Sequence, residues 1–101
     1  MHVDTLTDNS EKSQTVQRQM VISNIAGLHA RPAAAFVKLA GQFSCEIFVT
    51  KDDDTINGKS IIGLLSLAAG KGQAIWIKAS GDDASAALDA LQELVDGRFE
   101  E

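Results

Sequence analysis

Several features that particular protein classes require are missing from this sequence. One cysteine, Cys45, stands among 101 residues, so no intrachain disulfide can form. Two histidines and that cysteine cannot complete a four-ligand structural zinc site without carboxylates. No apolar run approaches the ~20 residues that span a bilayer, and residues 1–15 lack the basic and apolar regions of a secretory signal. We therefore expect a cytoplasmic protein without membrane insertion.

Net positive charge is also lacking, but the charges are unevenly placed. The formal net charge is −5 and the pI is near 4.8, which disfavours a nucleic-acid partner because such partners require a basic footprint. Even so, no Asp or Glu lies between Lys12 and Cys45, or between Thr55 and Gly81. Each basic window is expected either to face a phosphate or acidic partner or to be an ordinary solvated surface.

The length and the 45% apolar content suit one small domain with its own core. Residues 1–15 are predicted to be a flexible N-terminal extension, and residues 16–101 the folded domain. Alternating apolar residues predict strands at 16–22, 44–50, 55–57 and 73–79. Helical spacing with glycine stops predicts helices at 30–40, at 61–69 and from Asp82 onward. The order β-α-β-β-α-β-α predicts a two-layer α+β fold, with the helices covering one face of the sheet.

The run GLHARPA at residues 27–33 carries the chemical signal. His29 follows a loop glycine and precedes the helix, where free N–H groups and the helix dipole favour an anion. Pro32 fits the first helical turn, and Arg31 adds a permanent cation suited to phosphate oxygens. A neutral imidazole is a competent nucleophile. This arrangement favours a transiently phosphorylated His29, whereas the simpler alternative is that His29 only caps the helix.

Two segments resemble one known family. GLHARPAAAFVKLA at residues 27–40 resembles the active-site segment of HPr, the histidine-containing phosphocarrier of the bacterial phosphoenolpyruvate-dependent phosphotransferase system. NGKSIIGLLSLA at residues 57–68 resembles the second signature of that family, at the family's separation of the two motifs. The resemblance extends from residue 16 to about residue 97. Ala26 departs from the Asn that many members carry, and Leu67 to Ala69 is more similar to the nitrogen-related NPr branch.

The resemblance implies a phosphoryl relay without a cofactor or a metal. His29 matches the histidine that accepts phosphate on Nδ1 from enzyme I and passes it to a histidine of an enzyme IIA domain. Arg31 and the backbone amide of Ala30 match the groups that hold the phosphate. The implied protein forms a phosphohistidine intermediate but is not a free-standing turnover enzyme. The implied fold is an open-faced sandwich with an antiparallel sheet in the order 1-4-2-3.

The second motif predicts a partner surface and a second modification site. Ser60 matches the serine that HPr kinase/phosphorylase modifies in relatives, or it is simply the helix cap. Exposed apolar residues mark a docking site. The expected docking residues are Ile61, Ile62 and Leu65, rimmed by Lys38 and Lys59.

Two functions remain open at this point. In either of them the protein is expected to act as a monomer. The first is the phosphocarrier; the alternative is a regulatory module that docks on kinases or transcription regulators. A generic ligand-binding α+β domain is disfavoured by the paired motifs. Cys45 is expected to be a buried strand residue, and the Asp52–Asp54 run a solvated turn because it lacks the spacing of a calcium loop.

Strand alternation predicts which residues lie on the uncovered face of the sheet. The apolar residues expected to point outward are Val21, Phe48 and Trp76. Exposure of a Trp and a Phe in water is unfavourable. The expected cover is the N-terminal extension, through Val3 and Leu6, with a second copy of the chain or simple exposure as alternatives.

Overall fold

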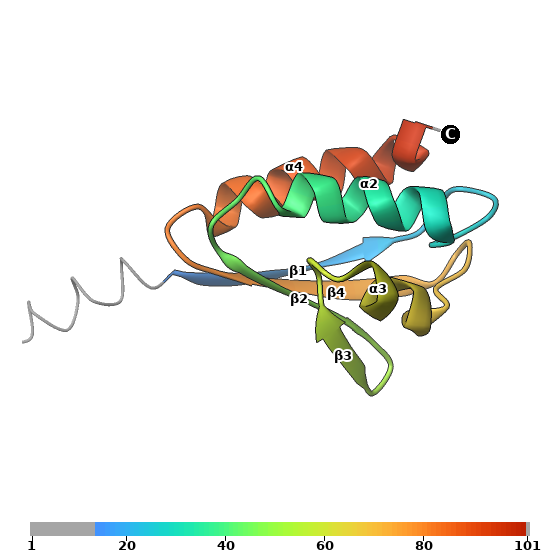
Figure 1. Cartoon of the computed structure of the whole chain (residues 1–101), viewed down its shortest axis with the longest axis horizontal. Coiled ribbons are helices and arrows are strands. Elements are labelled where there is room, and N and C mark those ends of the chain that lie inside the picture. The colour runs from blue at the N-terminus through green and yellow to red at the C-terminus, as the bar shows by residue number, and fades with distance from the viewer. Residues whose placement is uncertain (1–13, 101) are drawn as a thin grey trace, which may run out of the picture.

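The computed structural model describes residues 14–100 as a four-stranded antiparallel sheet in the order β1-β4-β2-β3, with helices packed on it (Figure 1). The strands are β1 (Thr15–Val21), β2 (Glu46–Lys51), β3 (Asp54–Asn57) and β4 (Ala74–Ser80). The helices are α2 (Ala30–Ala40), α3 (Ile61–Leu67), α4 (Ala84–Asp96) and a 3₁₀ turn (Arg98–Glu100). The predicted α+β open-faced sandwich and its strand order are confirmed. Residues 1–13, most of the predicted extension, lie outside the described residues.

The two faces of the sheet differ because strand side chains alternate. The inward positions carry the core, and they include Met20, Ile47, Val49, Ile75 and Ile77. The outward positions include Val21, Trp76 and Phe48, whose exposed fractions are 52%, 46% and 37%. Trp76 pairs with Gln19 of β1 and Thr50 of β2, so Val21 and Phe48 are its diagonal neighbours on either side. The predicted row of outward apolar side chains is therefore confirmed.

Helix α2 has the bounds that the sequence predicts. Gly41 follows its last residue and donates a hydrogen bond to Val37 O at 2.9 Å. The buried side of α2 consists of Pro32, Ala33, Phe36 and Ala40. α2 packs against α3 and α4, and α4 in turn packs on β1 and β4. Figure 1 shows α2 and α4 running side by side over the sheet.

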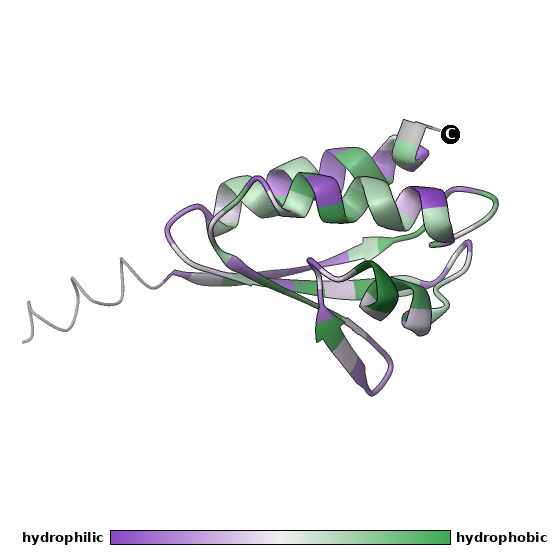
Figure 2. Ribbon diagram, viewed as in Figure 1, coloured by the Kyte–Doolittle hydropathy of each residue, from purple (hydrophilic) through white to green (hydrophobic). Residues whose placement is uncertain are grey.

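Helix α3 is shorter than predicted. It ends at Leu67, because Ala68 adopts the left-handed conformation with φ 52° and ψ 40°. The expected continuation to Ala69 is therefore wrong by two residues. The cap is closed by the Ala68 N–H, which donates to Leu65 O at 3.1 Å. α3 packs against β2 and β3 as well as α2, and Figure 2 shows it coloured largely as hydrophobic.

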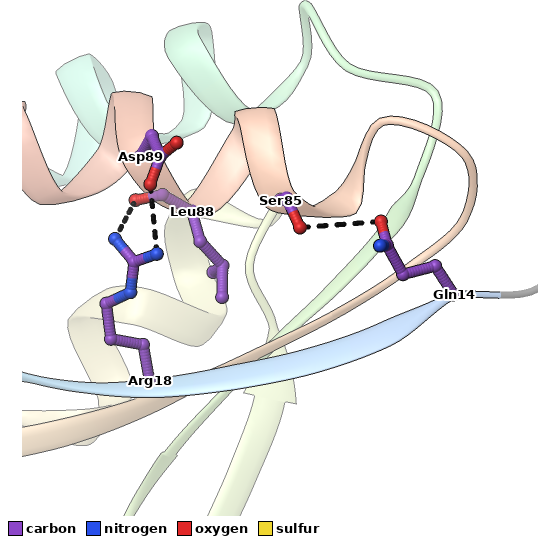
Figure 3. A network of polar contacts seen from close by, with 5 residues as sticks. All are labelled: Gln14, Arg18, Ser85, Leu88 and Asp89. Atoms are coloured by element: carbon purple, nitrogen blue, oxygen red, sulfur yellow. Dashed lines mark hydrogen bonds and ion pairs between the residues drawn. The ribbon is translucent and has the colours of Figure 1, made fainter.

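Polar contacts fasten α4 to β1 (Figure 3). The guanidinium of Arg18 forms an ion pair with Asp89 at 2.9 Å and donates to Leu88 O at 3.4 Å. The Ser85 hydroxyl contacts Gln14 Oε1 at 3.4 Å, and the Gly81 N–H donates to Gln14 O at 2.8 Å. Gln14 and Thr15, which the sequence assigns to the extension, thus make contacts with the folded domain.

The single cysteine, Cys45, is buried as predicted, but it lies just before β2 and not within the strand, which begins at Glu46. Burial, followed by the hydrogen bond and charge of Asp83, raises the pKa of the Cys45 thiol from 9.0 to about 11. The thiol is therefore protonated and unreactive near neutral pH. Within residues 14–100, no helix is long and apolar enough to cross a membrane.

Candidate functional site

The loop before α2 is held tightly against the end of the α3 segment. Gly27 has φ +72°, a conformation that favours glycine. A Cβ added at Gly27 would lie 2.6 Å from Ala69 O, which leaves no room for another residue. The next residue, Leu28, is buried and donates its N–H to Ala69 O at 2.8 Å. Both contacts fix the position of the chain just before His29.

Asn24, in the same loop, is fully buried. Its Nδ2 donates to Gly27 O at 2.8 Å, and the Gly27 N–H donates back to Asn24 O at 3.2 Å. The sequence signal for this contact is an Asn three residues before a glycine, which is typical of a turn closed by a side chain.

His29 occupies the N-cap position of α2, with extended backbone angles of φ −86° and ψ −167°. Its carbonyl accepts the first intrahelical hydrogen bond, from the Ala33 N–H at 2.9 Å. The side chain is exposed and makes no capping hydrogen bond. The imidazole therefore makes no capping contact with the helix and is exposed to solvent.

The first turn of α2 is suited to an anion. The N–H groups of Ala30 and Arg31 precede the first intrahelical hydrogen bond, so the helix supplies no acceptor for them. Pro32 has no N–H, and the turn contains no acidic residue. The Arg31 side chain is exposed and forms no ion pair with any side chain from residue 14 to residue 99. The exposed imidazole of His29 thus stands at a helix N-terminus that carries two amides without a helical acceptor and an exposed arginine two residues on.

Helix α3 presents an apolar surface to solvent. Ser60 is its N-cap, and the hydroxyl oxygen accepts from the Gly63 N–H at 3.0 Å. Ile61, Ile62 and Leu65 are exposed, whereas the other two leucines of the helix are buried. We call these three exposed residues the α3 patch. The structure agrees with the predicted division of α3 into a buried side and an exposed side.

The contacts at its ends show that α3 runs antiparallel to α2. Beyond its C-terminal end, Ala69 contacts Leu28, which precedes His29. Before its N-terminal end, the Lys59 ammonium donates to Phe43 O at 2.7 Å, just after α2. His29 therefore lies near the end of α3, and Ser60 lies about one α3 length away.

Of the two lysines expected to rim the α3 patch, one lies beside α3 and the other does not. Lys59 directly precedes α3 and is partly buried by its contact with Phe43. Lys38 instead borders a hollow between α2 and α4 that is also lined by Leu39, Leu94 and Phe99. The expectation that Lys38 rims the patch therefore requires correction, because the 3.6-residue period turns Lys38 toward α4. It shares the Arg31 face of α2, seven residues further along.

Comparison with known proteins agrees with this geometry. A family model described as "PTS HPr component phosphorylation site" matches residues 16–96. The phosphocarrier protein HPr of Neisseria meningitidis is 44% identical over 86 residues, which cover 85% of this chain and 97% of the relative. The phosphocarrier protein NPr of Shewanella violacea is 42% identical over 86 residues, which cover 85% of this chain and 94% of the relative.

The solved structures show the same fold. The crystal structure of HPr-C-His from Thermoanaerobacter tengcongensis has a TM-score of 0.82 with this chain at 43% identity. That match covers 85% of this chain and 97% of the other. The match to the family model, the relatives and the fold, together with the exposed histidine at a helix N-terminus, leads to one conclusion: the chain belongs to the HPr family of phosphocarrier proteins of the phosphotransferase system.

Proposed function

We propose that His29 is the residue that carries the phosphoryl group, and that it receives the group from enzyme I and delivers it to a histidine of an enzyme IIA domain. The observation that carries this proposal is the exposed, uncapped imidazole at the N-terminus of α2. The Nδ1 lone pair attacks phosphorus, the bond from phosphorus to the donor atom of enzyme I breaks, and no water is consumed. In the transfer to enzyme IIA, a histidine nitrogen of that domain attacks the same phosphorus, and the bond between phosphorus and Nδ1 of His29 breaks.

Arg31 and two backbone amides have a defined part in this step. The phosphoryl oxygens carry negative charge in the carrier and in the transition state. The N–H groups of Ala30 and Arg31 point along the start of α2, where such an anion is stabilised. The Arg31 guanidinium adds two parallel donors, and Lys38 extends the positive charge along the same face of α2.

The α3 patch is the proposed docking surface for both partners. Ile61, Ile62 and Leu65 lie on the helix whose far end adjoins the loop of His29. An apolar centre with a basic rim suits an acidic partner, since complementary charge speeds association. Lys59 supplies that rim at the N-terminal end of α3. We propose that the protein acts there as a monomer in the cytoplasm.

Ser60 is the proposed second switch, a site for HPr kinase/phosphorylase. Its hydroxyl already accepts an N–H at the start of α3, so a phosphate there meets a free helix end and leaves the fold intact. The new charge would lie at the edge of the α3 patch. A regulatory role is thereby compatible with the carrier role and does not require loss of His29.

The test is phosphorylation by enzyme I and labelled phosphoenolpyruvate. We expect wild-type protein and Ser60→Ala to take up label that is released by acid, and His29→Ala to take up none. His2→Ala is the matched control and should be labelled normally. Arg31→Ala should slow transfer by roughly 10- to 100-fold, the scale of one positioned charge, and Arg31→Lys should recover part of the loss. Label retained in His29→Ala but lost in Ser60→Ala would refute the assignment.

A further inference from the structure

Asn24 is the one polar residue among residues 14–100 whose side chain is buried, with 0% of its surface exposed. It lies in the loop between β1 and α2, five residues before His29. Burying an amide is costly unless its hydrogen bonds are made inside the protein. The contacts of this side chain therefore indicate what the residue does in the loop.

Asn24 is connected to His29 through a single carbonyl group. Asn24 Nδ2 donates to Gly27 O at 2.8 Å. The His29 backbone N–H donates to the same Gly27 O at 3.0 Å. One oxygen thus receives both the buried amide and the backbone of the proposed phosphoryl acceptor. When Asn24 fixes that oxygen, it also fixes the direction of the His29 N–H.

The other end of the Asn24 amide is not satisfied. Asn24 Oδ1 is buried and has no hydrogen-bond partner within residues 14–100. The hydrogen bond that the buried side chain makes to the protein is therefore the one that Nδ2 donates to Gly27 O. A donor at this position is what the loop uses.

We propose that Asn24 is a positioning residue for phosphoryl transfer: through Gly27 O it holds the backbone of His29 so that the imidazole stands at the N-terminus of α2. This inference rests on the proposed function of His29. Asn24 is buried beneath the loop and does not touch the phosphate. Its effect is geometric, because transfer requires the attacking nitrogen and phosphorus to be aligned closely, and small displacements reduce the rate steeply.

The decisive variant is Asn24→Leu, which keeps the branching and the number of heavy side-chain atoms but removes the amide donor. With enzyme I as catalyst and this protein as the varied substrate, we expect kcat to fall roughly 10- to 100-fold. KM should stay within about twofold, because the α3 patch is untouched. The variant should remain folded at the assay temperature, since it loses a single hydrogen bond, the one to Gly27 O. Ile77→Val, a core change in β4, is the matched control and should leave kcat unchanged.

A readout without phosphate separates this inference from the proposed function. In Asn24→Leu, the ¹H–¹⁵N amide signal of His29 should shift and exchange faster with solvent, because its acceptor is no longer fixed. If Asn24→Leu does not fold, Asn24→Ala replaces it with the same expectations for kcat and for the amide. An unlabelled wild type would refute the proposed function. The positioning role alone would be overturned if the wild type is labelled and the Asn24 variants have the same kcat as the wild type. It would also be overturned if the amide signal of His29 has the same chemical shift in the variants as in the wild type.

Discussion

The carboxylate of Asp83 accepts a hydrogen bond from the backbone N–H of Cys45 at 2.9 Å. It also accepts from the Ser44 N–H at 2.8 Å and from the Ser44 hydroxyl at 3.3 Å. Asp83 is the N-cap residue of α4 but makes no capping bond with its side chain. It instead joins the start of α4 to the segment that enters β2, 38 residues earlier.

This contact predicts how stability responds to acid. The Ser44 N–H, with the bonds from Cys45, holds the pKa of Asp83 below its usual 3.8, although partial burial opposes the shift. A lowered folded-state pKa gives stability that is complete above the unfolded value and is lost as pH falls through the folded value. We expect the Tm of the wild type to decrease below about pH 4, and that of Asp83→Ala to decrease less. The Tm of Asp82→Ala, the neighbouring control, should depend on pH as that of the wild type does. If the Tm of Asp83→Ala also falls with pH in parallel with the wild type, Asp83 is not the source of the acid sensitivity.

Ala68 offers a stability test at the end of α3. It is exposed and has φ 52°, a conformation that is unfavourable for a residue with a Cβ. Ala68→Gly should raise the free energy of unfolding by roughly 0.5–1 kcal/mol, because glycine adopts the left-handed region without strain. Urea denaturation measures the change. Ala34→Gly, on the exposed side of α2, is the control with the opposite sign: it should lower the free energy of unfolding by about 1 kcal/mol.

The sequence predicts most of the fold because its strongest signals are local. Gly27, Pro32 and Gly41 bracket α2, and both of its predicted ends are correct. Alternation along β2 and β4 correctly places Phe48 and Trp76 on the open face. Such patterns depend on neighbouring residues alone, so one sequence is enough to identify them.

The features that the sequence does not reveal depend on contacts between distant residues. Ala68 is a good helix former, so nothing in its type indicates a left-handed cap. Asp83 has the sequence character of a helix cap, yet its carboxylate bonds to Ser44 and Cys45. The burial of Asn24 could not be recognised either, because Asn is common in exposed turns. Each of these outcomes is decided by tertiary packing.

The α3 patch predicts an effect on recognition but not on folding. Ile61→Glu places a charge in an exposed apolar surface, the one proposed to dock an acidic partner. The KM for this protein in the enzyme I assay should rise about tenfold or more, while thermal stability stays close to wild type. Val21→Glu is the matched control, because Val21 is equally apolar and exposed but lies on the opposite face of the sheet. Equal KM values for the two variants would exclude the patch as the docking surface.

Ser60 predicts a regulatory effect through the same surface. Asp at this position can accept the Gly63 N–H as the serine does, so Ser60→Asp should fold normally. Its charge should repel an acidic enzyme I and slow phosphorylation of His29 by roughly two- to tenfold. Ser60→Ala loses the cap without adding charge, and its rate should equal that of the wild type. If Ser60→Asp also reacts at the wild-type rate, the regulatory role is refuted.

The open face of the sheet supplies the last prediction. Val21, Trp76 and Phe48 form a diagonal row of side chains that are about half exposed. Complete burial of such a side chain from full exposure is worth about 1.5–3 kcal/mol, so covering each would add roughly half of that. The sequence favours residues 1–13 as the cover, a segment outside the described residues. Leu6 is eight residues from Gln14 and can reach up to ~27 Å from it. Trp76 is four positions from Ser80, the partner of Thr15, or roughly 13 Å along β4.

Deletion of residues 1–13 retains Gln14 and its bonds to Gly81 and Ser85, so the domain should remain folded. Trp76 is the only tryptophan, and its fluorescence therefore reports this face alone. If the segment covers Trp76, the deletion should shift the emission to longer wavelength, and a double variant with Val3→Ser and Leu6→Ser should do the same. A shift on dilution of the full chain would indicate a second copy as the cover. Emission already characteristic of a solvated indole, and unchanged by deletion and dilution, would show that neither cover exists.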